Sequence, residues 1–150
     1  MKAIKSKIKK TELLIRTRKA QLDEESQKLS NIRSSKLEHL EKLKEHQANY
    51  MNGVDSLNIE RQSGDRLRLS TLERSVDYSK SRWYQCLRQV KELEEQEKEQ
   101  LSLVLVAQRN LKSMEKIQEG NRQTLQVEAG RNEQKSLDEM SVHNFNKRHI

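Results

Sequence analysis

Residues 69–125 read LSTLERSVDYSKSRWYQCLRQVKELEEQEKEQLSLVLVAQRNLKSMEKIQEGNRQTL and carry the pattern that decides the fold. Every seventh residue from Leu69 forms one mostly apolar series, the a series: Leu69, Val76, Trp83, Val90, Glu97, Val104, Leu111, Gln118 and Leu125. The d series stands three residues further on: Leu72, Ser79, Cys86, Leu93, Gln100, Ala107 and Met114. Apolar residues at alternating spacings of three and four lie along one side of an α-helix. The pattern therefore predicts a long helix that buries a narrow stripe against another helix.

The first half of the chain carries a weaker version of this pattern. Its a series is apolar or aromatic at six of seven positions: Ile8, Ile15, Leu22, Leu29, Lys36, Leu43 and Tyr50. The companion positions are mostly polar: Ile4, Thr11, Arg18, Glu25, Ile32 and His39. Because Leu37 and Leu40 follow Lys36, we expect the apolar stripe to change phase there, as at a coiled-coil stutter.

Turn residues stand at both ends of the segment between the two halves. Asn52-Gly53 can close a helix, and Ser63-Gly64-Asp65 can cap the next one. We expect a first helix over about 3–52, a connector over about 53–65 and a second helix over about 66–140. Each helix has one apolar stripe to hide, and the nearest cover is the other helix. The predicted fold is all-α, a long antiparallel two-helix coiled-coil hairpin that forms a single elongated domain over 1–150.

The second helix is expected to extend past the first. Beyond Ile117 it carries Gly120, Asn121 and Gly130, which are weak helix positions, with glycine costing about 1 kcal/mol relative to alanine. We expect fraying or partner-dependent order from about Gly120 onward, and a frayed tail over about 141–150.

Composition agrees with a thin helical protein. Only 32% of the 150 residues are hydrophobic and 35% are charged, against ~45–50% and ~25% in ordinary globular domains. Proline is absent, which permits uninterrupted helices. Cys86 is the single cysteine, so no intrachain disulfide is possible, and its place in the d series indicates a small buried hydrophobe. With no signal-peptide core and no apolar run of ~18–20 residues, we expect a cytoplasmic protein.

Motifs for catalysis and for cofactor binding are missing from the sequence. It has no phosphate-binding glycine loop, no Cys-x-x-Cys, no His-Glu-x-x-His and no nucleophile elbow. His39 and His46 lie about two turns apart, roughly 10 Å, which is too far to share one metal ion. We therefore expect no enzyme activity, no metal and no cofactor.

Two stretches suggest binding surfaces. The first twenty residues hold eight lysines and arginines against one glutamate, Glu12. Such a basic helical end suits an acidic protein surface, a nucleic acid or an anionic membrane. The run from Leu101 to Val106 is too apolar for one narrow stripe, so Leu103, Leu105 and Val106 are predicted to form an exposed apolar patch for a partner or a third covering surface. Trp83 is expected in the core, with Tyr78 and Tyr84 outside it.

The whole-chain pattern resembles the FliJ/YscO family of type III export stalk proteins, flagellar and injectisome. The resemblance rests on length, on a shorter basic first helix before a longer second one, and on two stretches: STLERSV at 70–76 and QKSLDEM at 134–140. In that family the hairpin is similar to the rotor of rotary ATP synthases.

This resemblance implies a central stalk that inserts into a hexameric export ATPase and links it to the export gate and to secretion chaperones. Carried over by position, Lys5, Lys9, Arg16 and Lys19 belong to the ATPase contact, together with the end of the second helix. Leu69, Leu72 and Val76 fall in the stretch that meets the cytoplasmic domain of the export-gate membrane protein. The implied location is cytoplasmic, peripheral to the inner-membrane export apparatus, without binding to nucleic acid and without insertion into the membrane.

Two other classes stay open on the residues alone. A generic coiled-coil adaptor would use the strong stripe of 69–125 to associate with itself. A nucleic-acid or membrane-surface binder would use the first twenty residues, and its binding would fall steeply with salt without needing a protein partner.

Overall fold

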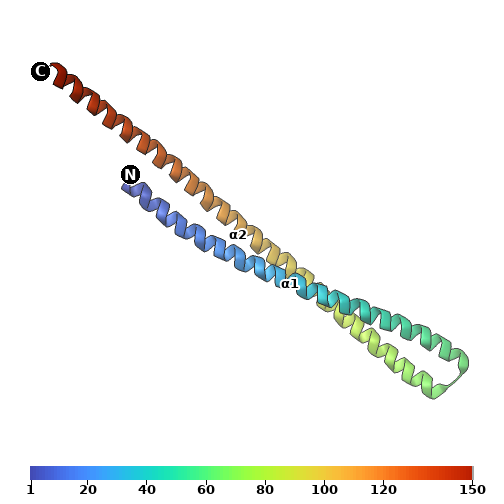
Figure 1. Cartoon of the computed structure of the whole chain (residues 1–150). Coiled ribbons are helices and arrows are strands. Elements are labelled where there is room, and N and C mark those ends of the chain that lie inside the picture. The colour runs from blue at the N-terminus through green and yellow to red at the C-terminus, as the bar shows by residue number, and fades with distance from the viewer. Residues whose placement is uncertain (150) are drawn as a thin grey trace. The chain divides into compact units, whose positions relative to one another are not determined.

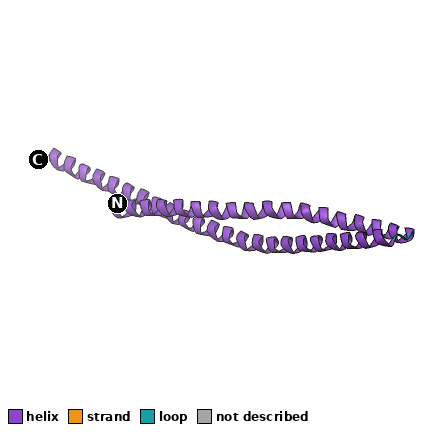
Figure 2. Cartoon of the chain, turned by 90° about the horizontal axis from the view of Figure 1, so that it is seen from below, coloured by secondary structure: helices purple, strands orange, loops and turns teal. Residues whose placement is uncertain are grey.

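The computed structural model describes residues 1–149 and contains two α-helices. Helix α1 spans Lys2–Ser63 and helix α2 spans Arg66–His149, and the two are joined at Gly64 and Asp65 (Figure 1). Coloured by secondary structure, the described chain shows helix throughout except at this turn and at the first residue, and it shows no strand (Figure 2). The prediction of an all-α fold with two long helices packed against each other is confirmed.

The turn between the helices is much shorter than the expected connector over 53–65. Gly64 has φ 81°, a conformation that glycine adopts at little cost, and its N–H donates to the Glu60 carbonyl at 3.2 Å. The Asp65 carboxylate then caps α2, since Oδ1 accepts from the N–H groups of Leu67 at 3.2 Å and Arg68 at 3.5 Å. Two residues therefore end one helix and begin the next.

Residues 53–63, expected to be a connector, instead form the last three turns of α1. The helix continues because the a series continues: Leu57 follows Tyr50 by seven residues and is buried, with 6% of its surface exposed. Gly53 serves close packing here instead of a turn. A Cβ atom added at Gly53 would lie 3.1 Å from Cγ2 of Val76 on α2.

The expected change of phase after Lys36 does not occur. Leu37 points to solvent, with 65% of its surface exposed, whereas Lys36 stays half-buried between the helices. Half-buried or buried residues of α1 keep alternating spacings of three and four through both sides of this point, at 29, 32, 36, 39, 43, 46 and 50, and Ser35 and Leu40 beside them are also half-buried. The stripe on α1 is therefore continuous, and Lys36 is a polar member of it.

Contacts between the two helices fall into two compact units. The terminal unit consists of Met1–Glu24 and Leu105–Ile150, and the bend unit consists of Glu25–Val104. Both units are antiparallel pairs of helical segments, as their contacts show below. Each is described by itself.

In the bend unit, the a and d residues of α2 form the core with α1. Val76, Cys86, Val90 and Val104 are buried, and Leu29 and Leu57 are buried from the α1 side. Trp83 is half-buried, with its ring centroid 5.4 Å from that of Tyr50. The expectation for Cys86 is confirmed, whereas Trp83, expected in the core, lies at its edge.

In the terminal unit, polar residues replace part of the core. Thr11, Ala107 and Gln118 are buried, and Asn121 Nδ2 lies 3.5 Å from Thr11 Oγ1. The amino group of Met1 lies 3.6 Å from Glu128, which marks the last described ion pair between the two segments. Residues 130–148 of α2, called the overhang below, are exposed throughout.

The expected loss of helix near the C-terminus is not observed in the described residues. Helix α2 continues through Gly120 and Gly130 and includes 141–149, the tail that was expected to fray, while Ile150 lies outside the described residues. Gly120 is exposed, but Asn121 is half-buried and contacts Thr11 of α1, so the overhang begins about ten residues later than expected.

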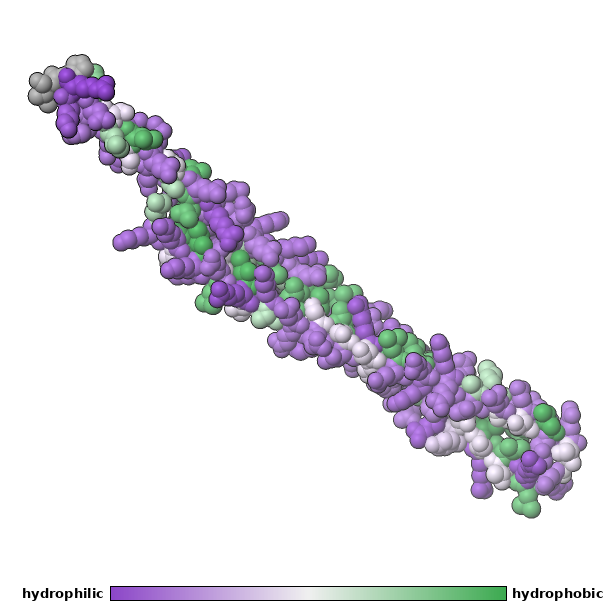
Figure 3. Space-filling model, in the orientation of Figure 1, coloured by the Kyte–Doolittle hydropathy of each residue, from purple (hydrophilic) through white to green (hydrophobic). Residues whose placement is uncertain are grey.

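On the face that Figure 3 shows, most of the surface is hydrophilic, with smaller hydrophobic areas between the hydrophilic residues. Neither helix is apolar enough over its described length to cross a membrane.

Candidate protein-interaction surfaces

A basic stripe runs along one face of α1 in the terminal unit. Lys5, Lys9, Arg16 and Lys19 are all exposed, and none of the four makes an ion pair within residues 1–149. Their spacings of four, seven and three residues place them on one side of the helix, with Glu12 among them. Four cations against one carboxylate give this stripe a positive potential directed at solvent.

The overhang is the second feature of the terminal unit. At 1.5 Å per residue, its nineteen residues from 130 to 148 extend about 28 Å as a single unpaired helix. Its apolar side chains are 58–61% exposed: Leu137, Met140, Val142 and Phe145. Because this segment is exposed throughout, its helix gains little stability from tertiary packing, and a partner that covers these side chains would stabilise it.

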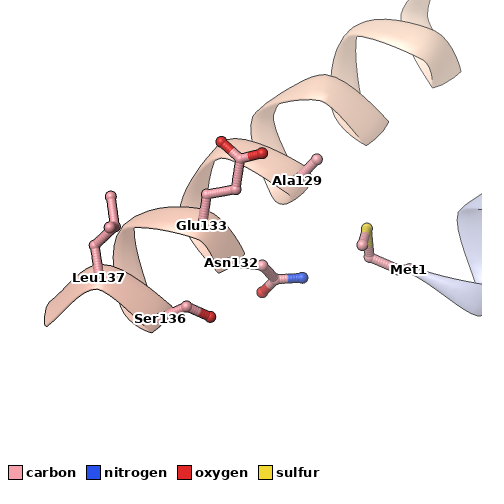
Figure 4. A pocket seen from close by; sticks show the side chains of 6 residues that line it. All are labelled: Met1, Ala129, Asn132, Glu133, Ser136 and Leu137. Atoms are coloured by element: carbon pink, nitrogen blue, oxygen red, sulfur yellow. The ribbon is translucent and has the colours of Figure 1, made fainter. Parts of the chain in front are cut away.

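A shallow hollow lies where α1 begins beside α2. It is lined by Met1 together with Ala129, Asn132, Glu133, Ser136 and Leu137. Figure 4 shows the side chain of Met1 reaching from α1 toward this stretch of α2. The hollow carries no group with catalytic geometry, and we interpret it as the edge of the helix pair.

Buried polar groups make the interior of the terminal unit unusual. Only 3% of Gln118 is exposed, and within residues 1–149 neither Nε2 nor Oε1 of its amide has a hydrogen-bond partner. Thr11 is satisfied by its own helix, since its hydroxyl donates to the Lys7 carbonyl at 2.8 Å. An unpaired buried amide costs about 1–3 kcal/mol, so this end of the helix pair is held less tightly than its length suggests.

Leu69, Leu72 and Val76 do not form the outer surface that the export-gate assignment requires. Val76 is only 8% exposed, and Leu69 and Leu72 are half-buried in the seam, the interface that the a and d residues of the two helices form. The exposed side chains of the same region are different ones, with Leu67 85% exposed and Tyr78 61% exposed. The heptad positions of the three residues could have indicated this, because a and d residues face the partner helix.

An aromatic cluster borders the seam of the bend unit. The ring of Trp83 stacks on that of Tyr84 at 5.4 Å, and Tyr84 is 46% exposed. Lys80 Nζ lies 5.7 Å from the centre of the Tyr84 ring, and Arg82 Nε donates to the Tyr78 hydroxyl at 2.9 Å. The prediction that both tyrosines lie outside the core is confirmed.

The predicted exposed apolar residues of α2 are indeed exposed. Leu103 in the bend unit is 51% exposed, and in the terminal unit Leu105 is 44% and Val106 is 49% exposed. Their use by a partner stays a prediction.

The described histidines and acidic residues form no metal site. No group of three or more potential ligands comes together within residues 1–149. His39 lies in the seam, with Nδ1 2.8 Å from the Ser35 carbonyl of its own helix, and His46 is half-buried.

Sequence reasoning missed one feature of the bend unit. Lys36 and Glu97 each interrupt an a series, and the structure brings them together, with Nζ 3.2 Å from Oε2. Arg33 adds a second contact, with Nε 3.6 Å from Oε1 of Glu97. The sequence could have indicated this pair, since each a series contains a single charged residue and the two have opposite signs.

Comparison with protein-family models gives a match over most of the chain. A family model described as "Flagellar FliJ protein" matches residues 8–149, which includes nearly all of both helices. No curated protein matches the chain, and no solved structure matches it.

Proposed function

The chain belongs to the FliJ family, which is associated with flagellar and type III protein export, and we propose that it is the central stalk of a bacterial type III export ATPase. Its partners in this proposal are the hexameric ATPase, the cytoplasmic domain of the export-gate membrane protein and secretion chaperones. The chain itself is not an enzyme in this proposal and needs no cofactor.

The observation that carries the proposal is the make-up of the terminal unit. It combines the basic stripe of Lys5, Lys9, Arg16 and Lys19 with a helical overhang whose apolar side chains are largely exposed to solvent. A ring of subunits with an acidic lining would attract the stripe, and its apolar surface would cover the overhang. The terminal unit is therefore the part that enters the ATPase.

A paired helix suits a stalk for mechanical reasons. Its backbone hydrogen bonds are satisfied within each helix, so it keeps its form while contacts with surrounding subunits change. In this proposal the ring hydrolyses ATP, and the stalk contacts successive subunits of the ring without contributing catalytic residues.

The bend unit offers surfaces for the remaining partners. We assign the export-gate contact to the exposed side chains near the turn, chiefly Leu67 and Tyr78, in place of the seam residues Leu69, Leu72 and Val76. Exposed apolar and aromatic side chains are the common anchors of protein interfaces.

The test is a binding measurement between the full chain and the purified hexameric export ATPase at low and moderate salt. One variant reverses the stripe: Lys5→Glu, Lys9→Glu, Arg16→Glu and Lys19→Glu. A matched control reverses four exposed lysines of the bend unit that make no ion pair within the described chain: Lys42→Glu, Lys44→Glu, Lys91→Glu and Lys98→Glu.

The stripe variant should bind at least about tenfold more weakly, because each exposed ion pair contributes roughly 0.2–1 kcal/mol and reversal adds repulsion. The control should bind as the unchanged chain does, and wild-type binding should weaken with added salt. Equal losses in both variants would show that only net charge matters. Binding to nucleic acid or anionic vesicles alone, with none to the ATPase, would refute the stalk and favour a basic surface binder.

A further inference from the structure

Each helix has one charged side chain in its a series, and the two meet. On α1 the a series from Ile8 to Leu57 is otherwise uncharged, and on α2 the series from Leu69 to Leu125 contains Glu97 as its one charged member. Lys36 Nζ lies 3.2 Å from Glu97 Oε2, and both side chains are only about a quarter exposed, at 26% and 24%.

A second contact shows that the Lys36–Glu97 contact follows from the register in which α1 and α2 pack. Tyr50 and Trp83, which also belong to the a series, lie with their ring centroids 5.4 Å apart. Moving two heptads along each helix, from Tyr50 to Lys36 and from Trp83 to Glu97, leads from one pair to the other. In the bend unit, residues of one a series therefore face residues of the other.

The same residues would clash if two copies paired through identical helices. In a parallel coiled coil each a residue faces its own copy. Two α2 helices would then place Glu97 against Glu97, and two α1 helices would place Lys36 against Lys36. Only the pairing of α1 with α2 puts opposite charges together at this level.

We propose that the Lys36–Glu97 pair selects the intramolecular hairpin over association of two copies through the seam of α2. A half-buried ion pair contributes little net stability, because removing both charges from water offsets most of their attraction. The pair acts instead by destabilising the competing dimer, in which two side chains of like charge would be buried against each other. This proposal goes beyond the stalk function and does not depend on it.

The test compares full-length chains with altered charge at this level of the seam. The apolar variant is Lys36→Leu with Glu97→Leu. The exchanged variant is Lys36→Glu with Glu97→Lys, and it includes Arg33→Gln to remove the guanidinium beside position 97. A control, Lys44→Leu with Glu95→Leu, adds similar apolar atoms at exposed positions.

Two measurements report on self-association. Sedimentation over a range of concentrations gives the molar mass and the dimer dissociation constant, while circular dichroism confirms that each variant is helical. Cys86 gives an internal reporter of parallel α2 pairing. It is 7% exposed in the hairpin, but as a d residue it would face its own copy in a parallel pair, where an added oxidant such as diamide would remove two electrons and two protons to form a disulfide.

We expect the wild-type chain, the exchanged variant and the control to remain monomers without the Cys86 cross-link. The apolar variant should dimerise with a dissociation constant at least about tenfold lower than that of wild type, since replacing polar a residues relaxes specificity. It should also form the cross-link. An apolar variant that stays helical and monomeric, or an exchanged variant that dimerises as readily as the apolar one, would overturn the proposal.

Discussion

Replacing Gln118 with leucine should make the protein more stable, although Gln118 is one of its most buried residues. It occupies the a series of α2 in the terminal unit and is 3% exposed. Its amide Nε2 and Oε1 find no hydrogen-bond partner in the part of the chain that the structure describes, so folding removes both atoms from water without replacing the hydrogen bonds they made there. Leucine is similar in size and leaves no polar group unpaired.

The expected gain follows from two effects. Removing an unsatisfied buried polar group relieves about 1–3 kcal/mol. Apolar carbon that is buried in place of the polar amide atoms contributes about 0.8 kcal/mol per carbon. Together these predict an increase of about 2–4 kcal/mol in the free energy of unfolding, and a rise of roughly 5–15 °C in Tm for a chain of this length.

Thermal and urea unfolding followed by circular dichroism would measure the change, and hydrogen exchange would locate it at residues 107–125. Gln100→Leu is the matched control. Gln100 is also buried, at 8% exposure, but its Nε2 donates to the Glu25 carbonyl at 2.9 Å and to the Glu25 carboxylate. That substitution removes one donor from the half-buried Glu25 carboxylate, so it should increase the free energy of unfolding by at least about 1.5 kcal/mol less than Gln118→Leu does. Equal effects of the two substitutions, or a loss of stability in Gln118→Leu, would refute the reasoning.

Three further predictions concern the turn, the glycines and the overhang. Asp65→Ala should lower the free energy of unfolding by about 0.5–2 kcal/mol, because it removes the cap of α2, and urea unfolding would measure this, with an unchanged midpoint contradicting it. Gly120→Ala should raise the free energy of unfolding by about 1 kcal/mol, since nothing lies within 4 Å of the added Cβ. Gly53→Ala should raise the free energy of unfolding by less than Gly120→Ala does, because its Cβ would lie 3.1 Å from Val76. Equal increases for the two substitutions would show that Val76 moves aside at no cost. Amides of residues 130–148 should exchange fast in the free chain and at least about tenfold more slowly with the ATPase bound, and unchanged exchange there would exclude this segment from the contact.

Most of α2 was predictable from local pattern. The a and d series over 69–125 name the residues that the structure buries or half-buries, including Cys86, Val90 and Ala107. The prediction holds because a heptad pattern on a helix defines its buried side without knowledge of the partner. Exposure of the basic stripe follows for the same reason, since Lys5 and Lys9 lie outside the a and d positions of α1.

The end of α1 was predicted less well, because turn signals are ambiguous. Asn52-Gly53 has the composition of a helix end, yet Gly53 lies within α1, where its lack of a side chain admits Val76. The true end has Gly64 at φ 81° followed by the Asp65 cap. Continuing the a series one heptad further, to Leu57, would have favoured the later site.

By itself, the sequence determined that the protein is two long helices with one narrow stripe each, because helix periodicity and the absence of proline are local properties. Tertiary structure alone decided which residues face each other. Leu37 is apolar but exposed to solvent. Lys36 lies between the helices because its ammonium group forms an ion pair with the Glu97 carboxylate there. The energy of a polar seam residue depends on the group opposite it, and that group stands sixty-one residues away in the chain.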